Sequence, residues 1–137
     1  MVPGGVLETA VYAEDLAAAE AFYGGLLGLE PVLREPGRHV FFRCGAGMLL
    51  VFDPRATAHP PDPASPLPVP PHGAHGPGHL AFRATAEELE GWVARLTAAG
   101  IAIEADFRWP NGARSVYVRD PAGNSVEFAE PRLWGLG

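Results

Sequence analysis

Lysine is absent from this chain of 137 residues, and all ten basic residues are arginine. With 16 acidic residues the net charge is −6. Binding to nucleic acid or to an anionic membrane rests on a basic surface, so this charge argues against both as general partners. Arginine offers a planar fork for carboxylates and phosphates, so an arginine inside a pocket would suit an anionic ligand. Compositional bias is the simpler explanation for the missing lysine, since the chain is also rich in alanine, proline and glycine.

Cysteine is almost absent too, and long apolar runs are missing. The single Cys44 excludes an internal disulfide framework and a cysteine-based zinc cluster. No run approaches the roughly 18 apolar residues that a membrane-spanning helix needs. The first residues lack the basic region and long apolar stretch of a secretory signal. We therefore expect a soluble, cytoplasmic protein.

The residues that are present have a globular composition, with 47% hydrophobic and 19% charged residues, enough for one domain with a single well-buried core. Apolar spacing predicts two helices, which Gly28 and Gly100 would end, over 15–27 and 85–99. Alternating patterns between turn residues predict eight strands, over 6–12, 30–34, 39–44, 48–53, 78–83, 101–105, 113–119 and 124–130.

Residues 54–77 carry nine prolines and no periodicity, which predicts a long loop without regular structure between two βαβββ patterns. The order predicts an α+β fold in a single domain over 1–137, with one module at 6–53 and a second at 78–131. We expect the two modules to form an eight-stranded, cup-shaped mixed sheet with the helices on its outer face. An internal duplication is the simplest account of the repeated pattern.

Strand alternation places one potential metal ligand on the less apolar face of each of three strands. These residues are Glu8, His79 and Glu127. A cup made by two such modules would bring them toward a common point. Two carboxylates and an imidazole in a concave pocket are most easily reconciled by a divalent metal, with coordination positions left open for catalysis.

Three stretches carry a resemblance to a known family: YAEDLAAAEAFYGGLLGLE, GHLAF and YVRDPAGNSVEF. In this order and spacing the chain resembles the vicinal oxygen chelate superfamily, which includes glyoxalase I, extradiol dioxygenases, fosfomycin-modifying enzymes and bleomycin-binding proteins. The resemblance implies the cup-shaped fold, a small-molecule substrate and a homodimer, sometimes with strands shared between chains.

The resemblance also assigns the three metal ligands to Glu8, His79 and Glu127. The first position is usually His or Gln in better-known members, so Glu8 is a departure. The fourth ligand of glyoxalase I would fall near Leu50, which cannot bind a metal. The implied cofactor is one divalent ion, Zn²⁺, Mn²⁺, Mg²⁺ or Fe²⁺. The extra carboxylate favours a hard cation or Zn²⁺ over a redox iron centre.

Five further residues are candidates for catalysis or substrate binding. His75, in the loop before the fifth strand, and Tyr117 are candidates for moving a proton. Arg83 and Arg114 are candidates for holding an anionic substrate, and Trp109 for an apolar contact. Each has a plain structural alternative: a loop histidine without a role, a core aromatic, or a surface arginine.

Three functions are compatible with this pattern. The first is a metal-dependent enzyme of lyase or isomerase type, which acts on a small substrate that binds the metal through adjacent oxygens. The second is an extradiol-type dioxygenase. The third is a metal-free protein that binds a drug or metabolite, as bleomycin-resistance members do. Metal content separates the third from the others, and oxygen consumption with catechols separates the second from the first.

Overall fold

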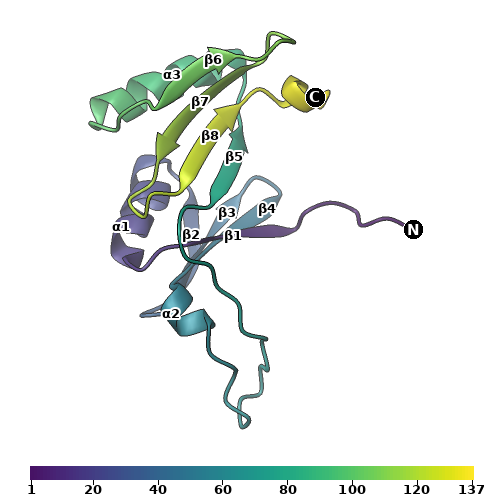
Figure 1. Cartoon of the computed structure of the whole chain (residues 1–137), viewed down its shortest axis with the longest axis vertical. Coiled ribbons are helices and arrows are strands. Elements are labelled where there is room, and N and C mark those ends of the chain that lie inside the picture. Colours follow the sequence, from purple (N-terminus) through teal and green to yellow (C-terminus); the bar gives the residue numbers. More distant parts are fainter. The chain divides into compact units, whose positions relative to one another are not determined.

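Each βαβββ pattern of the sequence forms its own four-stranded mixed sheet. The computed structural model describes all 137 residues and divides them into two units, Met1–Gly76 and Pro77–Gly137. The strand orders are β1-β4-β3-β2 and β5-β8-β7-β6, without a closed barrel. The predicted α+β class with two βαβββ modules is confirmed, and its eight strands are hydrogen-bonded as two sheets of four (Figure 1).

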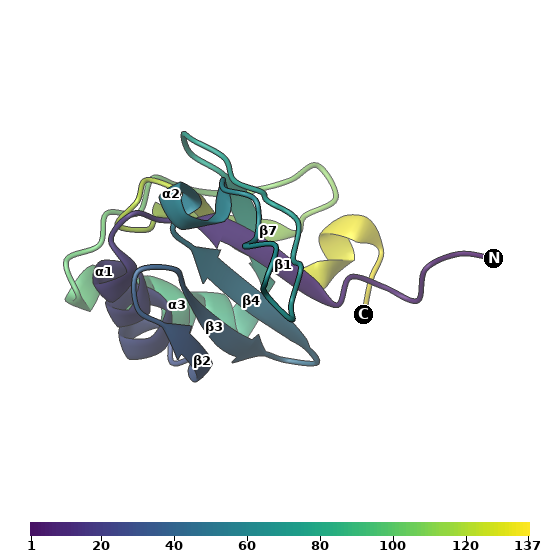
Figure 2. The same ribbon diagram turned by 90° about the horizontal axis from the view of Figure 1, so that it is seen from below.

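In unit 1 the first strand pairs with the last one, which leaves β1 and β2 as the two edges of an open sheet. β1 runs parallel to β4, while β3 is antiparallel to both of its neighbours. Figure 2 shows the four strands side by side in the order β1, β4, β3, β2. The elements of this unit are β1 (Glu8–Tyr12), α1 (Leu16–Glu20), the π-helical η1 (Ala21–Leu26), β2 (Glu30–Glu35), β3 (His39–Cys44), β4 (Gly47–Phe52) and α2 (Pro54–Thr57).

One face of the unit 1 sheet packs on the helical segment, and the other carries Glu8 and Tyr12. Phe22 and Tyr23 of η1 are buried, and the Tyr23 ring lies 6.1 Å from that of Phe42. The buried aliphatic residues of this core are Val11, Val40, Leu49 and Val51. Because side chains alternate, the neighbours of Val11 point to the opposite face of the sheet.

Unit 2 repeats the arrangement with a longer helix. β5 is parallel to β8, and β7 is antiparallel to β8 and β6. Its helix begins with a capping box, since Thr85 accepts from the Glu88 N–H and Glu88 accepts from the Thr85 N–H. The elements are β5 (His79–Arg83), α3 (Ala86–Ala98), β6 (Ala105–Arg108), β7 (Arg114–Arg119), β8 (Ser125–Ala129) and the 3-10 helix η2 (Pro131–Trp134).

The core of unit 2 lies between α3 and the apolar face of its sheet. Trp92 of α3 stacks on Phe128 of β8 with ring centroids 4.9 Å apart. The fully buried aliphatic side chains around them are Leu89, Leu96, Val116, Val118 and Val126. The opposite face of this sheet is therefore free to carry polar residues.

Two elements differ from the sequence-based expectation. The sixth strand lies at Ala105–Arg108 instead of 101–105, because the tight turn over 109–113 sets its register against β7. The proline-rich segment begins with α2, which Asp53 caps by accepting from the Arg55 N–H, with Pro54 at the first helical position. None of the helices is long and apolar enough to cross a bilayer.

Candidate functional site

His79 and Glu127 lie on neighbouring strands of unit 2, and their side chains meet. The register pairs Ala81 with Glu127. His79 is two residues before Ala81, so its ring projects from the same face of the sheet. The His79 Nε2 atom lies 3.3 Å from Glu127 Oε2. Two of the three predicted metal ligands are thus adjacent.

A backbone carbonyl fixes which nitrogen of His79 faces the carboxylate. Nδ1 lies 3.1 Å from the Ser125 carbonyl oxygen, which can only accept, so Nδ1 carries the proton and donates it. In the neutral ring, Nε2 then presents its lone pair toward Glu127. Metal-binding histidines are held in this way, with the second nitrogen donating to a carbonyl or carboxylate.

The two side chains of this pair differ in their exposure to solvent. The Glu127 side chain is 7% exposed and that of His79 is 52% exposed. A buried carboxylate facing an imidazole lone pair is costly unless a proton or cation lies between them. The donor set, one oxygen and one nitrogen with an open side, fits a divalent cation.

The turn before β8 places His79 at the start of its strand. Asp120 accepts from the Ala122 and Asn124 N–H groups, which shapes the turn. Asn124 in turn accepts from the Gly78 N–H at 2.8 Å. The Asp-Pro-x-Gly-Asn sequence therefore anchors the residue that precedes His79, beside the strand that carries Glu127.

The third predicted ligand, Glu8, lies in the other unit. Its side chain is exposed at the start of β1 and forms no hydrogen bond or ion pair. It shares a face with Ala10 and Tyr12. No group of three or more His, Cys, Asp or Glu side chains is placed to hold a metal ion. The role of Glu8 stays a prediction.

Ser115 and Trp109 support the other carboxylate oxygen of Glu127. The Ser115 hydroxyl donates to Glu127 Oε1 at 2.6 Å. The indole Nε1–H of Trp109 donates to Ser115 Oγ at 2.7 Å. The N–H group of Trp109 is engaged by Ser115, and the apolar contact of its ring with substrate stays a prediction.

Tyr117 lies beside His79 and Glu127, on the strand next to β8. Its ring is nearly parallel to that of His79, with centroids 6.1 Å apart, and the register places it opposite Glu127. Burial, and next the charge of Glu127, raise the pKa of the phenol. Tyr117 is therefore a protonated hydroxyl at neutral pH, able to donate a hydrogen bond.

The two predicted substrate arginines have protein partners. Arg114 donates from Nε and Nη2 to the two carboxylate oxygens of Asp106, each at 2.7 Å, and from Nη1 to Glu90. Arg83 donates to the Gly137 carbonyl oxygen. Arg114 thus ties β7 to β6 and α3, and its forked donor face is occupied. An anion-binding role for either arginine stays a prediction.

Of the two histidines in the loop before β5, His72 has a side-chain partner and His75 has none. His75 is exposed and forms no hydrogen bond or ion pair. The Nδ1 atom of His72 lies 2.6 Å from the Tyr12 hydroxyl oxygen. The His72 ring also meets the Phe52 ring edge-on, with centroids 4.6 Å apart. The backbone N–H of His72 also donates to the Thr57 carbonyl oxygen at 2.9 Å. These contacts hold the end of the loop against the face that carries Glu8.

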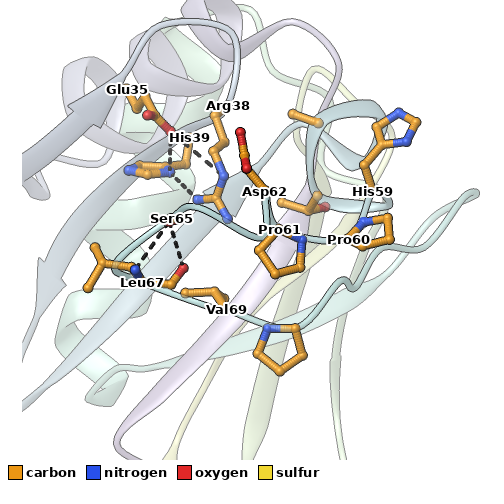
Figure 3. A pocket seen from close by; sticks show the side chains of 13 residues that line it. Glu35, Arg38, His39, His59, Pro60, Pro61, Asp62, Ser65, Leu67 and Val69 are labelled. Carbon is orange, nitrogen blue, oxygen red and sulfur yellow. Dashed lines mark hydrogen bonds and ion pairs between the residues drawn. The ribbon is translucent and has the colours of Figure 1, made fainter.

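Unit 1 also contains a pocket of about 410 Å³ beneath the proline-rich loop (Figure 3). Arg38 donates to His39 Nδ1 at 2.8 Å on one wall, and Leu67 and Val69 lie on the other. Burial, and next the charge of Arg38, lower the pKa of His39. The imidazole on this wall is therefore neutral at neutral pH.

Sequence reasoning did not find Ser115, His39 or the pairing of Tyr12 with His72. Alternation along β7 places Ser115 on the same face as Tyr117, so the signal for Ser115 was available. The contact of Tyr12 with His72 carries no such signal, because it spans 60 residues and depends on how the loop folds back.

Most of the chain matches the model of one known protein family. The family model described as Glyoxalase/Bleomycin resistance protein/Dioxygenase superfamily matches residues 5–128. The chain belongs to this superfamily. The match spans both modules, from before β1 into β8, and confirms the resemblance derived from the sequence.

Solved structures of this superfamily include a near relative of the chain. A structure described as lactoylglutathione lyase from Agrobacterium tumefaciens is 51% identical over 99% of this chain and 100% of its own, with a TM-score of 0.91. A glyoxalase family protein from Bacillus anthracis is 22% identical over 95% of this chain and 97% of its own, with a TM-score of 0.71, and shows the fold alone. A search of curated proteins gives no match.

Proposed function

We propose that this chain is a divalent-metal-dependent enzyme of lyase or isomerase type, acting on a small substrate with two adjacent oxygens. The metal would be held by Glu8, His79 and Glu127. The observation that carries the proposal is the His79–Glu127 pair, with Nδ1 committed to the Ser125 carbonyl and Nε2 facing a buried carboxylate. A divalent cation at these side chains supplies Lewis-acid stabilisation of negative charge on the substrate.

The protein's own groups have distinct parts in such a reaction. Glu127 is fixed by Ser115 and presents one oxygen toward His79. Tyr117 holds its proton at neutral pH and would donate a hydrogen bond to a substrate oxygen beside the pair. His75, in the loop before β5, is proposed as a proton carrier that approaches when substrate is bound. Arg83, Arg114 and the ring of Trp109 are proposed as substrate contacts.

The relative described as lactoylglutathione lyase supports the lyase arm of this proposal. One residue separates this chain from glyoxalase I as the resemblance describes it. Leu50 is 8% exposed and apolar, in register with Ala10 on the face that carries Glu8. It cannot supply a fourth ligand. We therefore expect slow or no turnover of lactoylglutathione, and turnover of another substrate with adjacent oxygens.

We also propose a homodimer in the cytoplasm that binds neither nucleic acid nor membrane. The absence of lysine and the net charge of −6 support this choice of partners.

Metal content of untagged protein, measured by elemental mass spectrometry, tests the proposal. We expect about one equivalent of a divalent metal, lost in Glu8→Ala and in Glu127→Ala while the fold survives. Glu30→Ala is the matched control, because Glu30 is an exposed strand glutamate that pairs only with Arg43. No metal after reconstitution would leave a metal-free binding protein, and oxygen uptake with catechols would instead establish a dioxygenase.

A further inference from the structure

We infer that Ser115 and Trp109 are positioning residues for Glu127. This inference rests on the proposed function, because it concerns how Glu127 is held for a metal. Trp109 lies after β6, Ser115 in β7 and Glu127 in β8, so the chain of hydrogen bonds crosses the sheet of unit 2. The residues come together through the pairing of Ser115 with Ala129 and of Tyr117 with Glu127.

The chemistry of these groups gives the hydrogen bonds a single direction. An indole N–H can only donate, so Ser115 Oγ accepts from Trp109. The Ser115 hydroxyl proton is then directed to Glu127 Oε1, which as part of a carboxylate can only accept. The indole thus selects the rotamer of the serine hydroxyl, and the hydroxyl selects the orientation of the carboxylate.

This orientation leaves one carboxylate oxygen for a cation. Ser115 is fully buried, and the Glu127 side chain is 7% exposed, so water does not compete for Oε1. Oε2 faces His79 Nε2 at 3.3 Å. Partners of ligating carboxylates commonly change metal affinity by about 10–100-fold when they are removed.

The turn after β6 holds Trp109 in place. The backbone N–H of Trp109 donates to the Ala113 carbonyl at 2.8 Å, and the backbone carbonyl of Trp109 accepts from the Gly112 N–H at 2.8 Å. The Phe107 ring meets the indole edge-on at 4.9 Å. The position of the indole is therefore fixed by the hairpin itself and transmitted to Glu127 through Ser115.

Mn²⁺ titration of the metal-free full chain by calorimetry tests this inference. We expect Ser115→Ala to weaken Mn²⁺ binding by about tenfold or more. Trp109→Phe removes the N–H and keeps an aromatic ring, and we expect a loss of about threefold because the serine hydroxyl remains. The double variant should bind no more weakly than Ser115→Ala, because Trp109 acts through the serine.

Two variants separate positioning from general damage to the fold. Ser115→Thr keeps the hydroxyl and should restore most of the affinity. Trp92→Phe is the matched control, since Trp92 packs on Phe128 at the opposite face of the sheet, and should leave Mn²⁺ affinity unchanged. Circular dichroism confirms that each variant is folded before it is titrated.

The outcomes distinguish the two proposals. Wild-type affinity in Ser115→Ala, with metal binding by the wild type intact, would overturn the positioning inference and leave the function standing. Additive losses in the double variant would show that Trp109 acts independently of Ser115 and would also overturn it. A wild-type chain that binds no Mn²⁺ would overturn the proposed function and the inference with it.

Discussion

At Tyr117, burial and the neighbouring Glu127 charge act in the same direction and raise the pKa of the phenol. In metal-free protein we expect its ionisation above the usual pH of about 10. The pKa of Tyr117 is higher in the folded than in the unfolded state, so the protonated phenol contributes to the free energy of unfolding. This contribution is fully present below about pH 10 and is lost as the pH rises through the folded pKa. The absorbance difference between wild type and Tyr117→Phe at alkaline pH isolates this group.

Glu127→Gln should move the Tyr117 pKa part of the way back toward its usual value. The carboxylate charge is removed, while burial, the larger cause, remains. An unchanged Tyr117 titration in Glu127→Gln would contradict the placement of these two side chains.

Arg114 is expected to contribute to the stability of unit 2. Its side chain is only 14% exposed and binds Asp106 through two charge-assisted hydrogen bonds. Arg114→Met should lower the free energy of unfolding by about 1–3 kcal/mol at neutral pH, measured by urea denaturation. The hydrogen bonds from Arg114 lower the pKa of Asp106, so the difference should shrink as the pH falls through that pKa.

Arg43→Met is the matched control for Arg114→Met. Arg43 is also a strand arginine with a carboxylate partner, but it is 61% exposed. We expect a change within about 1 kcal/mol, as for most surface ion pairs. Equal changes in the free energy of unfolding for the two substitutions would show that burial does not strengthen the Arg114 ion pair.

The alternation of residues in strands was sufficient to predict that His79 and Glu127 share a face. It could not show that Trp109 reaches Ser115, because that contact depends on the turn over 109–113, which also sets the register of β6. Nor could it separate His75 from His72. The two lie three residues apart in a loop, and only the backbone bond from His72 to Thr57 decides which faces the sheet.

At the scale of elements, the proline-rich loop is held at its two ends. α2 is capped at its start by Asp53, and His72 is bound to Thr57 and Tyr12. We propose that the loop covers bound substrate. Replacing residues 60–69 with a shorter Gly-Ser linker should change the free energy of unfolding by less than about 1 kcal/mol, because loop length contributes slowly to stability.

The same replacement should raise KM, because residues 60–69 would no longer cover the bound substrate. Tyr12→Phe is the companion variant, since it loosens the end of the loop and leaves the pocket wall in place. An unchanged KM in the shortened variant would remove the covering role of the loop.

Helix and strand positions were predictable where one apolar face must be buried, as in α3 and β7. Residues 101–104 alternate in the same manner, yet β6 begins only at Ala105, since hydrogen bonding to β7 overrides the apolar pattern. The cap of α2 was readable from Asp53-Pro54, but a helix of four residues has no periodicity to detect.

At the scale of the whole molecule, we propose that a second chain covers β1. β1 is an edge strand, and Leu7 just before it is 75% exposed. Exposed edges and apolar residues of this kind are commonly covered by a partner. Light scattering coupled to size exclusion should therefore report two chains.

Subunit mixing shows whether each metal site takes residues from both chains. Glu8→Ala and Glu127→Ala, each unable to bind Mn²⁺ alone, should regain about a quarter of the wild-type sites when they are unfolded and refolded together, because half of the dimers are mixed and each mixed dimer has one intact site of two. A mixture of Glu8→Ala with His79→Ala is expected to behave in the same way. A mixture that stays without metal would place all three ligands on one chain.

The parallel pairing of β1 with β4 and of β5 with β8 has a consequence for synthesis. In each unit the first strand to leave the ribosome pairs with the last one of that unit. At about 5–20 residues per second, β1 waits for some seconds with both edges open, and with Val6 and Leu7 uncovered beside it. The earliest strand of each unit is thus the one with the longest exposure to other nascent chains and to chaperones, and it is the last to join its sheet.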